Sequence, residues 1–207
     1  MCNFDADISR WLVPSRFPAL IELRIAAEHD SVFSAEACTR MVSAISSFAS
    51  GLPRLQRFTL RFIELDSRQR IAFSLPELLH LEIYGVPPVL KAPKLETIRS
   101  GWIHRYDLWG FLAGTPRLRE LSIPDDLYAV DEAAFAALAL ASHPPLLPQL
   151  RKFDTGLPLS SCCFKALAAS APSLEVVDIS MSRLHAHDWL HALAGMPQLR
   201  VLRVTFW

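Results

Sequence analysis

The sequence predicts an α/β solenoid, with about eight short parallel strands in one sheet and helices or irregular segments on its other side. Two observations predict this fold. A segment recurs eight times: a proline, a leucine two residues later, an apolar residue five residues later and usually another apolar residue seven residues later. Stretches between these segments carry apolar residues at helical spacing. Self-similarity of this kind is the signature of repeat architectures.

Each copy of the repeat predicts one short strand. Leu121, Ser122 and Ile123 alternate between apolar and polar, as expected of a strand with one buried face. Proline suits the position before such a strand, because it ends a preceding helix without removing a ladder hydrogen bond. One short strand cannot bury its apolar face alone, so we expect the copies to stack into a single domain over residues 18–207, with 1–17 as an N-terminal flank or partial cap. The copies begin at Pro18, Pro53, Pro76, Pro93, Pro116, Pro148, Pro172 and Pro197.

The longest helical pattern covers residues 34–50. Its apolar stripe consists of Cys38, Met41, Val42, Ile45, Phe48 and Ala49. Shorter helices are expected at 107–113, 131–141, 160–169 and 188–194, each opening with Asp or Ser as an N-cap. The 62–75 and 84–92 connections lack the pattern, and Pro87 followed by Pro88 excludes a regular helix in the second. We therefore expect an uneven convex side.

Composition indicates a globular chain and excludes several function classes. Hydrophobic residues make up 51% and charged residues 20% of the 207, which argues against disorder. Lys plus Arg and Asp plus Glu are equal at 21 each, so no net field favours nucleic acid or an anionic membrane. The longest apolar run, 133–141, is too short to span a bilayer, and the N-terminus lacks the apolar core of a secretory signal. We expect a cytoplasmic or nuclear protein whose four cysteines are free thiols.

The repeat resembles the leucine-rich-repeat family. The family consensus LxxLxL is matched by Leu20, Leu23 and Ile25, and again in the copies that begin at Pro76, Pro116 and Pro197. Ser100 and Thr155 replace the third apolar residue in two copies. The Asn or Cys that the family usually has three residues further on is replaced here by Glu28, Ile63, Val86, Ile103, Asp126, Pro158, Ser182 and Trp207.

The missing Asn and the irregular repeat lengths make the chain most similar to the divergent repeats of F-box/LRR-type proteins. That resemblance implies substrate recognition for an SCF-type ubiquitin ligase. An F-box would need roughly 40 residues before the repeats, whereas 17 precede Pro18. The sequence is therefore expected to be truncated at one or both ends, or else to be a stand-alone repeat module.

A solenoid of this kind places the residues between the buried ones on its concave sheet surface. The expected central row is Arg24, Thr59, Glu82, Arg99, Ser122, Asp154, Asp178 and Arg203. Flanking rows add Arg57, Arg61, His80, Tyr84, Glu120 and Lys152, together with Glu22, Thr97, Ser180 and Thr205. We interpret this surface as a polar groove for a protein partner rather than for a small molecule. The alternative is an ordinary solvated sheet face, and the oligomeric state stays open.

His187 and His191 are the residues that invite a chemical interpretation. Their i, i+4 spacing on an expected helix is that of a zinc-metalloprotease motif, but Asp188 stands where that motif has Glu. A solvent-facing helix flank with Asp188 as N-cap is the favoured interpretation. We therefore expect no catalytic residue, metal or cofactor, and a binding scaffold rather than an enzyme. The alternatives are an architectural segment of a larger protein and, least favoured, a metal-dependent hydrolase.

Overall fold

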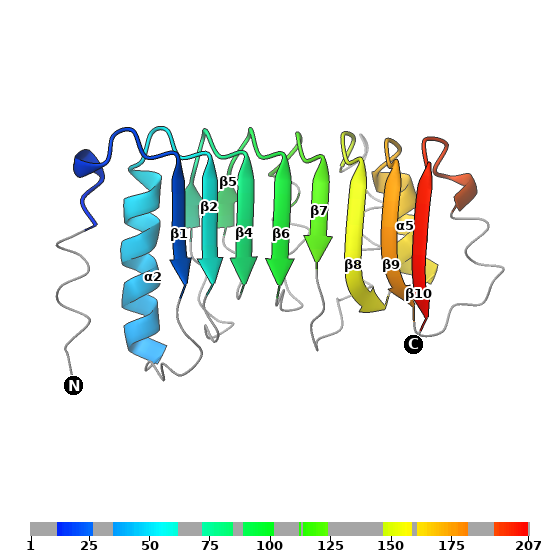
Figure 1. Cartoon of the computed structure of the whole chain (residues 1–207), viewed down its shortest axis with the longest axis horizontal. Coiled ribbons are helices and arrows are strands. Elements are labelled where there is room, and N and C mark those ends of the chain that lie inside the picture. Colours follow the sequence, from blue (N-terminus) through cyan, green and yellow to red (C-terminus); the bar gives the residue numbers. More distant parts are fainter. Residues whose placement is uncertain are drawn as a thin grey trace.

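The computed structural model describes residues 12–26, 35–61, 72–84, 89–101, 112, 114–123, 147–158, 161–181 and 193–206. In this part of the chain the fold is α/β, with eight parallel strands in one sheet (Figure 1). The sheet strands are β1 (Glu22–Ala26), β2 (Arg57–Arg61), β4 (His80–Tyr84), β6 (Thr97–Gly101), β7 (Glu120–Ile123), β8 (Lys152–Pro158), β9 (Val176–Met181) and β10 (Val201–Phe206). They follow one another in chain order across the sheet. Each of the eight predicted strands is present.

Alternation along the strands creates the core. In β2, Phe58 and Leu60 are buried, whereas Arg57 and Arg61 are exposed and Thr59 is half-buried. The same spacing recurs along the sheet, so two rows that are apolar except at Ser100 and Thr155 run across the eight strands on one side of it. The row that contains Phe58 consists of Leu23, Phe58, Leu81, Ile98, Leu121, Phe153, Val177 and Leu202.

The prolines occupy a turn that the sequence analysis did not recognise. In every copy the N–H two residues after the proline donates to the carbonyl one residue before it, as Leu118 does to Thr115 at 3.1 Å. Proline is therefore the second residue of a four-residue turn, where its fixed φ is favourable. At the start of the strand, two successive N–H groups donate to one carbonyl oxygen of the preceding copy. The Glu96 carbonyl, for example, accepts from the N–H groups of Arg119 and Glu120.

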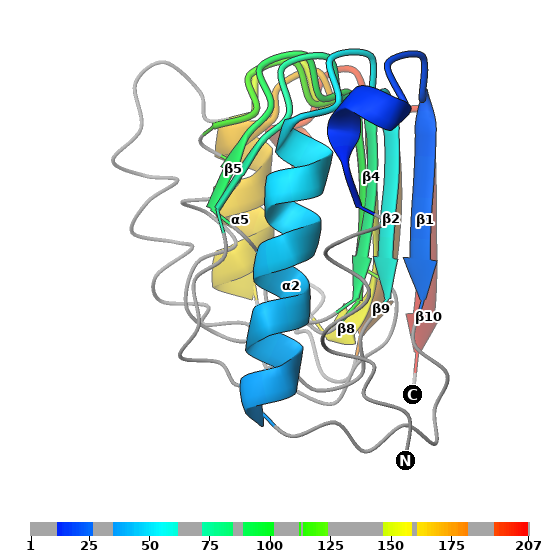
Figure 2. The ribbon, with the colours of Figure 1, turned by 90° about the vertical axis from the view of Figure 1, so that its left-hand side faces the viewer.

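Two α-helices lie in the described part of the chain, α2 (Ala35–Ser50) and α5 (Ser161–Ser170), and a short 3-10 turn, η1 (Pro14–Arg16), precedes β1. Both helices lie on the apolar side of the large sheet (Figure 2). They confirm the helices expected at 34–50 and 160–169 to within a residue. Ile45, Phe48 and Ala49 of the predicted stripe are buried and Met41 is half-buried, while the side chains of Cys38 and Val42 lie outside the described part. The Phe48 ring meets that of Phe17 edge-on at 5.9 Å.

The helix expected at 131–141 lies outside the described residues, as do those expected at 107–113 and 188–194 except for Leu112, Leu193 and Ala194. Two connections in which no helix was expected contain short strands instead. Strands β3 (Ala72–Ser74) and β5 (Val89–Lys91) pair in parallel as a separate two-stranded sheet. Phe73 of β3 packs edge-on against Phe58 of the large sheet at 5.4 Å. The sequence analysis missed these strands, because three residues are too few for an alternating pattern to be recognised.

Ser100 and Thr155 hold the positions of the second apolar row, although they are polar. They are 1% and 3% exposed, so these two side chains are buried in the core like the apolar residues of the same row. Among the described residues, the Ser100 hydroxyl has no hydrogen-bond partner. The outermost strands are less enclosed than the inner ones. Leu23 on β1 is half-buried and Leu202 on β10 is 37% exposed.

None of the helices in the described ranges combines the length and the apolar character that a membrane span requires.

Candidate protein-binding face

The candidate site is the side of the eight-stranded sheet opposite α2 and α5, which we call the open face. No described element covers it (Figure 2). Side chains alternate along each strand, so every residue between the two apolar rows lies on this face. The strand register aligns the central row as predicted. From β1 to β10 that row is Arg24, Thr59, Glu82, Arg99, Ser122, Asp154, Asp178 and Arg203.

Two further rows flank the central one. The row nearer the turns consists of Glu22, Arg57, His80, Thr97, Glu120, Lys152, Val176 and Val201. The other begins with Ala26, Arg61, Tyr84 and Gly101. Val176 and Val201 were not among the predicted site residues, although the same spacing from the proline would have identified them. Ser180 and Thr205, expected in the second flanking row, have side chains outside the described part.

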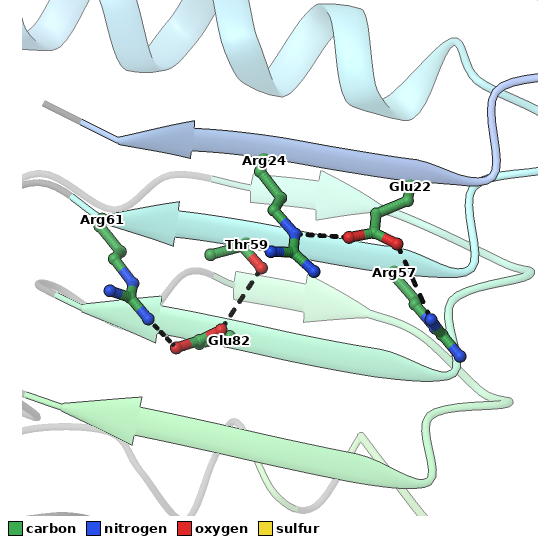
Figure 3. A network of polar contacts seen from close by, with 6 residues as sticks. All are labelled: Glu22, Arg24, Arg57, Thr59, Arg61 and Glu82. Atoms are coloured by element: carbon green, nitrogen blue, oxygen red, sulfur yellow. Dashed lines mark hydrogen bonds and ion pairs between the residues drawn. The ribbon is translucent and has the colours of Figure 1, made fainter.

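Glu82 on β4 is the centre of a fixed polar cluster. Its carboxylate accepts hydrogen bonds from Arg61 at 2.5 Å, from the Tyr84 hydroxyl at 3.1 Å and from the Thr59 hydroxyl at 3.5 Å. The guanidinium of Arg61 also stacks over the Tyr84 ring, with its carbon 4.8 Å from the ring centroid. Two side chains of the neighbouring strand β2 and one of β4 itself therefore hold this carboxylate in one place (Figure 3 shows the contacts with Arg61 and Thr59).

The cluster shifts the pKa values of its members. Burial by itself would raise the pKa of Glu82, but hydrogen bonds from Arg61 and Tyr84, with the charges of Arg61 and Arg99, outweigh it, so this pKa lies below its ordinary value. The hydrogen bond and the charge of Glu82 raise the pKa of Arg61. Burial, reinforced by Glu82, raises the pKa of Tyr84 against the opposing charges of Arg99 and Arg61. All three groups thus keep their neutral-pH charge states over a wider range.

A depression lies beside this cluster, between β1 and β6. Its volume is about 280 Å³, and its lining includes Arg24, Arg57, His80 and Arg99. Glu22 is shared by two of these cations: it pairs with Arg24 on its own strand and with Arg57 on the next strand at 3.7 Å (Figure 3). The side chains of Arg24 and Arg57 remain 75% and 61% exposed. Their guanidinium groups are therefore accessible to a ligand.

Over β7 to β10, the other half of the open face, carboxylates outnumber basic groups by three to two. Asp154 on β8 and Asp178 on β9 are direct register partners in the central row. Ser122 donates to Asp154 at 2.9 Å, and Arg203 lies 3.4 Å from Asp178. In the flanking row, Lys152 and Glu120 are 3.9 Å apart.

The geometry of the face suits polar recognition. It offers guanidinium groups that can bind carboxylates with two parallel hydrogen bonds, and carboxylates that can receive them. Within the described ranges, no three His, Cys, Asp or Glu side chains gather as metal ligands would. His187 and His191 lie outside those ranges, as do the side chains of Cys162 and Cys163.

No protein-family model matches the chain, and no curated protein matches its sequence. Among solved structures, the fold of the chain is similar to the crystal structure of a Bacteroides fragilis protein that was a structural-genomics target. The TM-score is 0.46 and the sequence identity 16%, over 95% of this chain and 68% of that chain. A likeness of this degree assigns neither family nor function.

Proposed function

We propose that the protein is a binding scaffold built as a leucine-rich-repeat solenoid, and that its open face binds a protein partner. The observation that carries this proposal is the register of the face. Two rows of mostly polar side chains run across the eight parallel strands, and the residues of the central row are aligned without a shift. A stack of one strand per repeat supports the solenoid interpretation.

The composition of the face supports a protein partner. Arginine and tyrosine are enriched at the energetic centres of protein interfaces. Arg57 on β2 and Arg99 on β6 line the depression, and Tyr84 lies on β4, the strand between them. Because the face mixes both charge signs, it favours a partner whose own charges are mixed over a polyanion such as nucleic acid.

The partner class that we propose is a substrate of an SCF-type ubiquitin ligase, in line with the resemblance to F-box/LRR-type repeats. The chain would then recognise the substrate through the open face, while an adaptor and a cullin would join through a segment other than the repeats.

The test compares proteins that the tagged chain captures from its native cell extract with those captured by charge-reversal variants. We expect Arg99→Glu and Asp178→Arg each to lose the specific partner, because each reverses one charged site in the centre of the face. Arg117→Glu, an exposed turn position away from the face, should keep it. Circular dichroism would verify that all variants are folded.

The outcomes separate the hypotheses. A partner that resists every substitution on the face contradicts the proposal. A chain that captures nothing, and whose transcript encodes further domains, favours an architectural segment that spaces other domains. Recovery of adaptor and cullin subunits with the substrate supports the ligase role, whereas a single partner without them supports an independent scaffold.

A further inference from the structure

The open face divides into two halves of opposite charge. Over β1 to β6 it carries four arginines, Arg24, Arg57, Arg61 and Arg99, against two glutamates, Glu22 and Glu82. Over β7 to β10 it carries Lys152 and Arg203 against Glu120, Asp154 and Asp178. The first half therefore has an excess of two positive charges and the second an excess of one negative charge, with histidine counted as neutral.

Existing contacts leave the positive half incompletely neutralised. Arg61 is committed to Glu82 and to the Tyr84 ring. Arg24 and Arg57 have to share Glu22. Arg99 lines the same depression as the register partner of Glu82, and its charge helps to lower the pKa of Glu82, but the two side chains form no direct ion pair. The depression thus presents more guanidinium groups than carboxylates, and a carboxylate from outside would complete the set.

The negative half has the converse arrangement. Asp154 and Asp178 face each other across adjacent strands, so the two carboxylates repel unless a cation lies near both. Arg203 lies 3.4 Å from Asp178, and the hydroxyl that donates to Asp154 belongs to the uncharged Ser122. A basic side chain placed over the pair would be attracted by both carboxylates.

The distance between the two halves sets the spacing that a ligand needs. The centre of the depression lies between β2 and β4, and the aspartate pair lies on β8 and β9, four strand spacings away in the sheet order. At about 4.8 Å per spacing the separation is about 19 Å, which an extended chain covers in about six residues.

We propose that the open face binds an extended protein segment lying across the strands, with an acidic side chain in the Arg24–Arg57–Arg99 depression and a basic side chain about six residues away over Asp154 and Asp178. This inference rests on the proposed function and adds the chemistry of the partner. A nucleic acid is disfavoured, because its phosphates would meet Asp154 and Asp178 along the same path.

The test is selection of peptides from a random displayed library on the intact chain. We expect the selected peptides to carry an acidic and a basic residue five to seven positions apart, enriched about threefold over the unselected library, the factor that exposed ion pairs produce. Binding of a selected peptide should weaken as salt is raised, since the paired charges are solvent-exposed.

Two variants report on the halves separately. On Arg57→Glu/Arg99→Glu, the acidic residue of the selected peptides should be replaced by a basic one. On Asp154→Lys/Asp178→Lys, the basic residue should be replaced by an acidic one. Arg117→Glu should select the same peptides as the unmodified chain. Far-UV circular dichroism confirms that each variant is folded, and either double variant alone tests one half.

Selected peptides without the spacing pattern, or with a pattern that neither double variant changes, would overturn the inference. So would tight binding of an oligothymidylate probe that Arg57→Glu/Arg99→Glu abolishes, because that result points to nucleic acid. The proposed function is tested separately. If face variants lose a captured partner and the peptides show no pattern, the proposed function stands and the face binds protein by other chemistry.

Discussion

Ser100 has a buried hydroxyl in an apolar row. The two neighbouring strands contribute Ile83 and Ile123 to the same row, so a polar atom there gains nothing from its surroundings. The side chain is 1% exposed, and its hydroxyl has no hydrogen-bond partner among the described residues. An unsatisfied buried polar group costs about 1–3 kcal/mol.

We predict that Ser100→Ala raises the free energy of unfolding by about 1 kcal/mol, since it removes the unsatisfied hydroxyl and leaves only a small void. Urea unfolding followed by circular dichroism measures the change. Ser74→Ala, at an exposed position on β3 where the hydrogen bond uses only the backbone N–H, should alter stability by no more than about 0.5 kcal/mol. A loss of stability for Ser100→Ala would show that the hydroxyl is bonded in solution.

Glu82 makes the stability of the sheet depend on pH. Its pKa in the folded chain lies below the ordinary value of 4.5, for which the hydrogen bonds from Arg61 and Tyr84 and the charges of Arg61 and Arg99 are responsible, against the opposing effect of burial. A carboxyl with a lowered pKa stabilises the fold above its unfolded pKa, and that contribution is lost as the pH falls through the folded pKa.

We therefore predict that Glu82→Gln lowers the free energy of unfolding at pH 7 by no more than about 1 kcal/mol, since the cluster is partly solvated. The difference from the unmodified chain should shrink as the pH falls below about 4.5. Unfolding measured between pH 3 and 7 tests this. Tyr84→Phe removes one of the hydrogen bonds to Glu82. Its pH-dependent loss of stability relative to the unmodified chain should therefore be smaller than that of Glu82→Gln. If the free energies of unfolding of Glu82→Gln and the unmodified chain differ by the same amount from pH 3 to 7, the titration of Glu82 does not contribute to stability.

At the scale of the element, the recurring unit is a turn followed by a strand. The turn fixes where the strand begins, because its proline, its closing hydrogen bond and the shared carbonyl acceptor hold the first strand residue in register with the preceding copy. Seven such steps produce rows aligned from β1 to β10. The position of a side chain on the open face is therefore set by its distance from the proline.

This regularity explains which parts of the structure were predictable. The rows of the open face follow from counting, and all eight central residues, from Arg24 to Arg203, lie in the predicted row. The contacts within the face were not predictable. Glu82 gathers Arg61 and Thr59 from a strand that precedes it by more than twenty residues, and side-chain rotamers decide such contacts. The charge division also required the strand order, because neighbouring strands are separated by connections of different length.

The connecting elements were predicted less completely than the strands. Helices α2 and α5 have long apolar stripes, which is why their bounds agree with the sequence to within a residue. Strands β3 and β5 have three residues each and gain their stability from each other and from contacts such as Phe73 with Phe58. Tertiary packing of this kind leaves no local pattern in the sequence.

At the scale of the whole molecule, burial depends on the position of a copy within the stack. The leucine two residues after the proline is fully buried in the inner copies, with Leu118 at 1% exposure and Leu174 at 0%. The equivalent residues of the outermost described copies, Leu20 and Leu199, are only half-buried. In a stack of repeats each copy contacts its neighbours alone, so an inner copy is covered from two sides and an outer copy mainly from one.

We predict that Leu118→Ala costs about 2–5 kcal/mol, because it removes a fully buried side chain from a core that closes incompletely around the cavity. Leu199→Ala should cost less than half as much, since water already contacts part of the leucine and can fill the space that remains. Urea unfolding of both variants, followed by circular dichroism and by hydrogen exchange, gives the comparison. Hydrogen exchange adds the location of the loss, which should spread over the copies next to Pro116 in the first variant and stay near β10 in the second. Equal costs for the two substitutions would mean that Leu199 is as enclosed in solution as Leu118, and that burial is uniform along the stack.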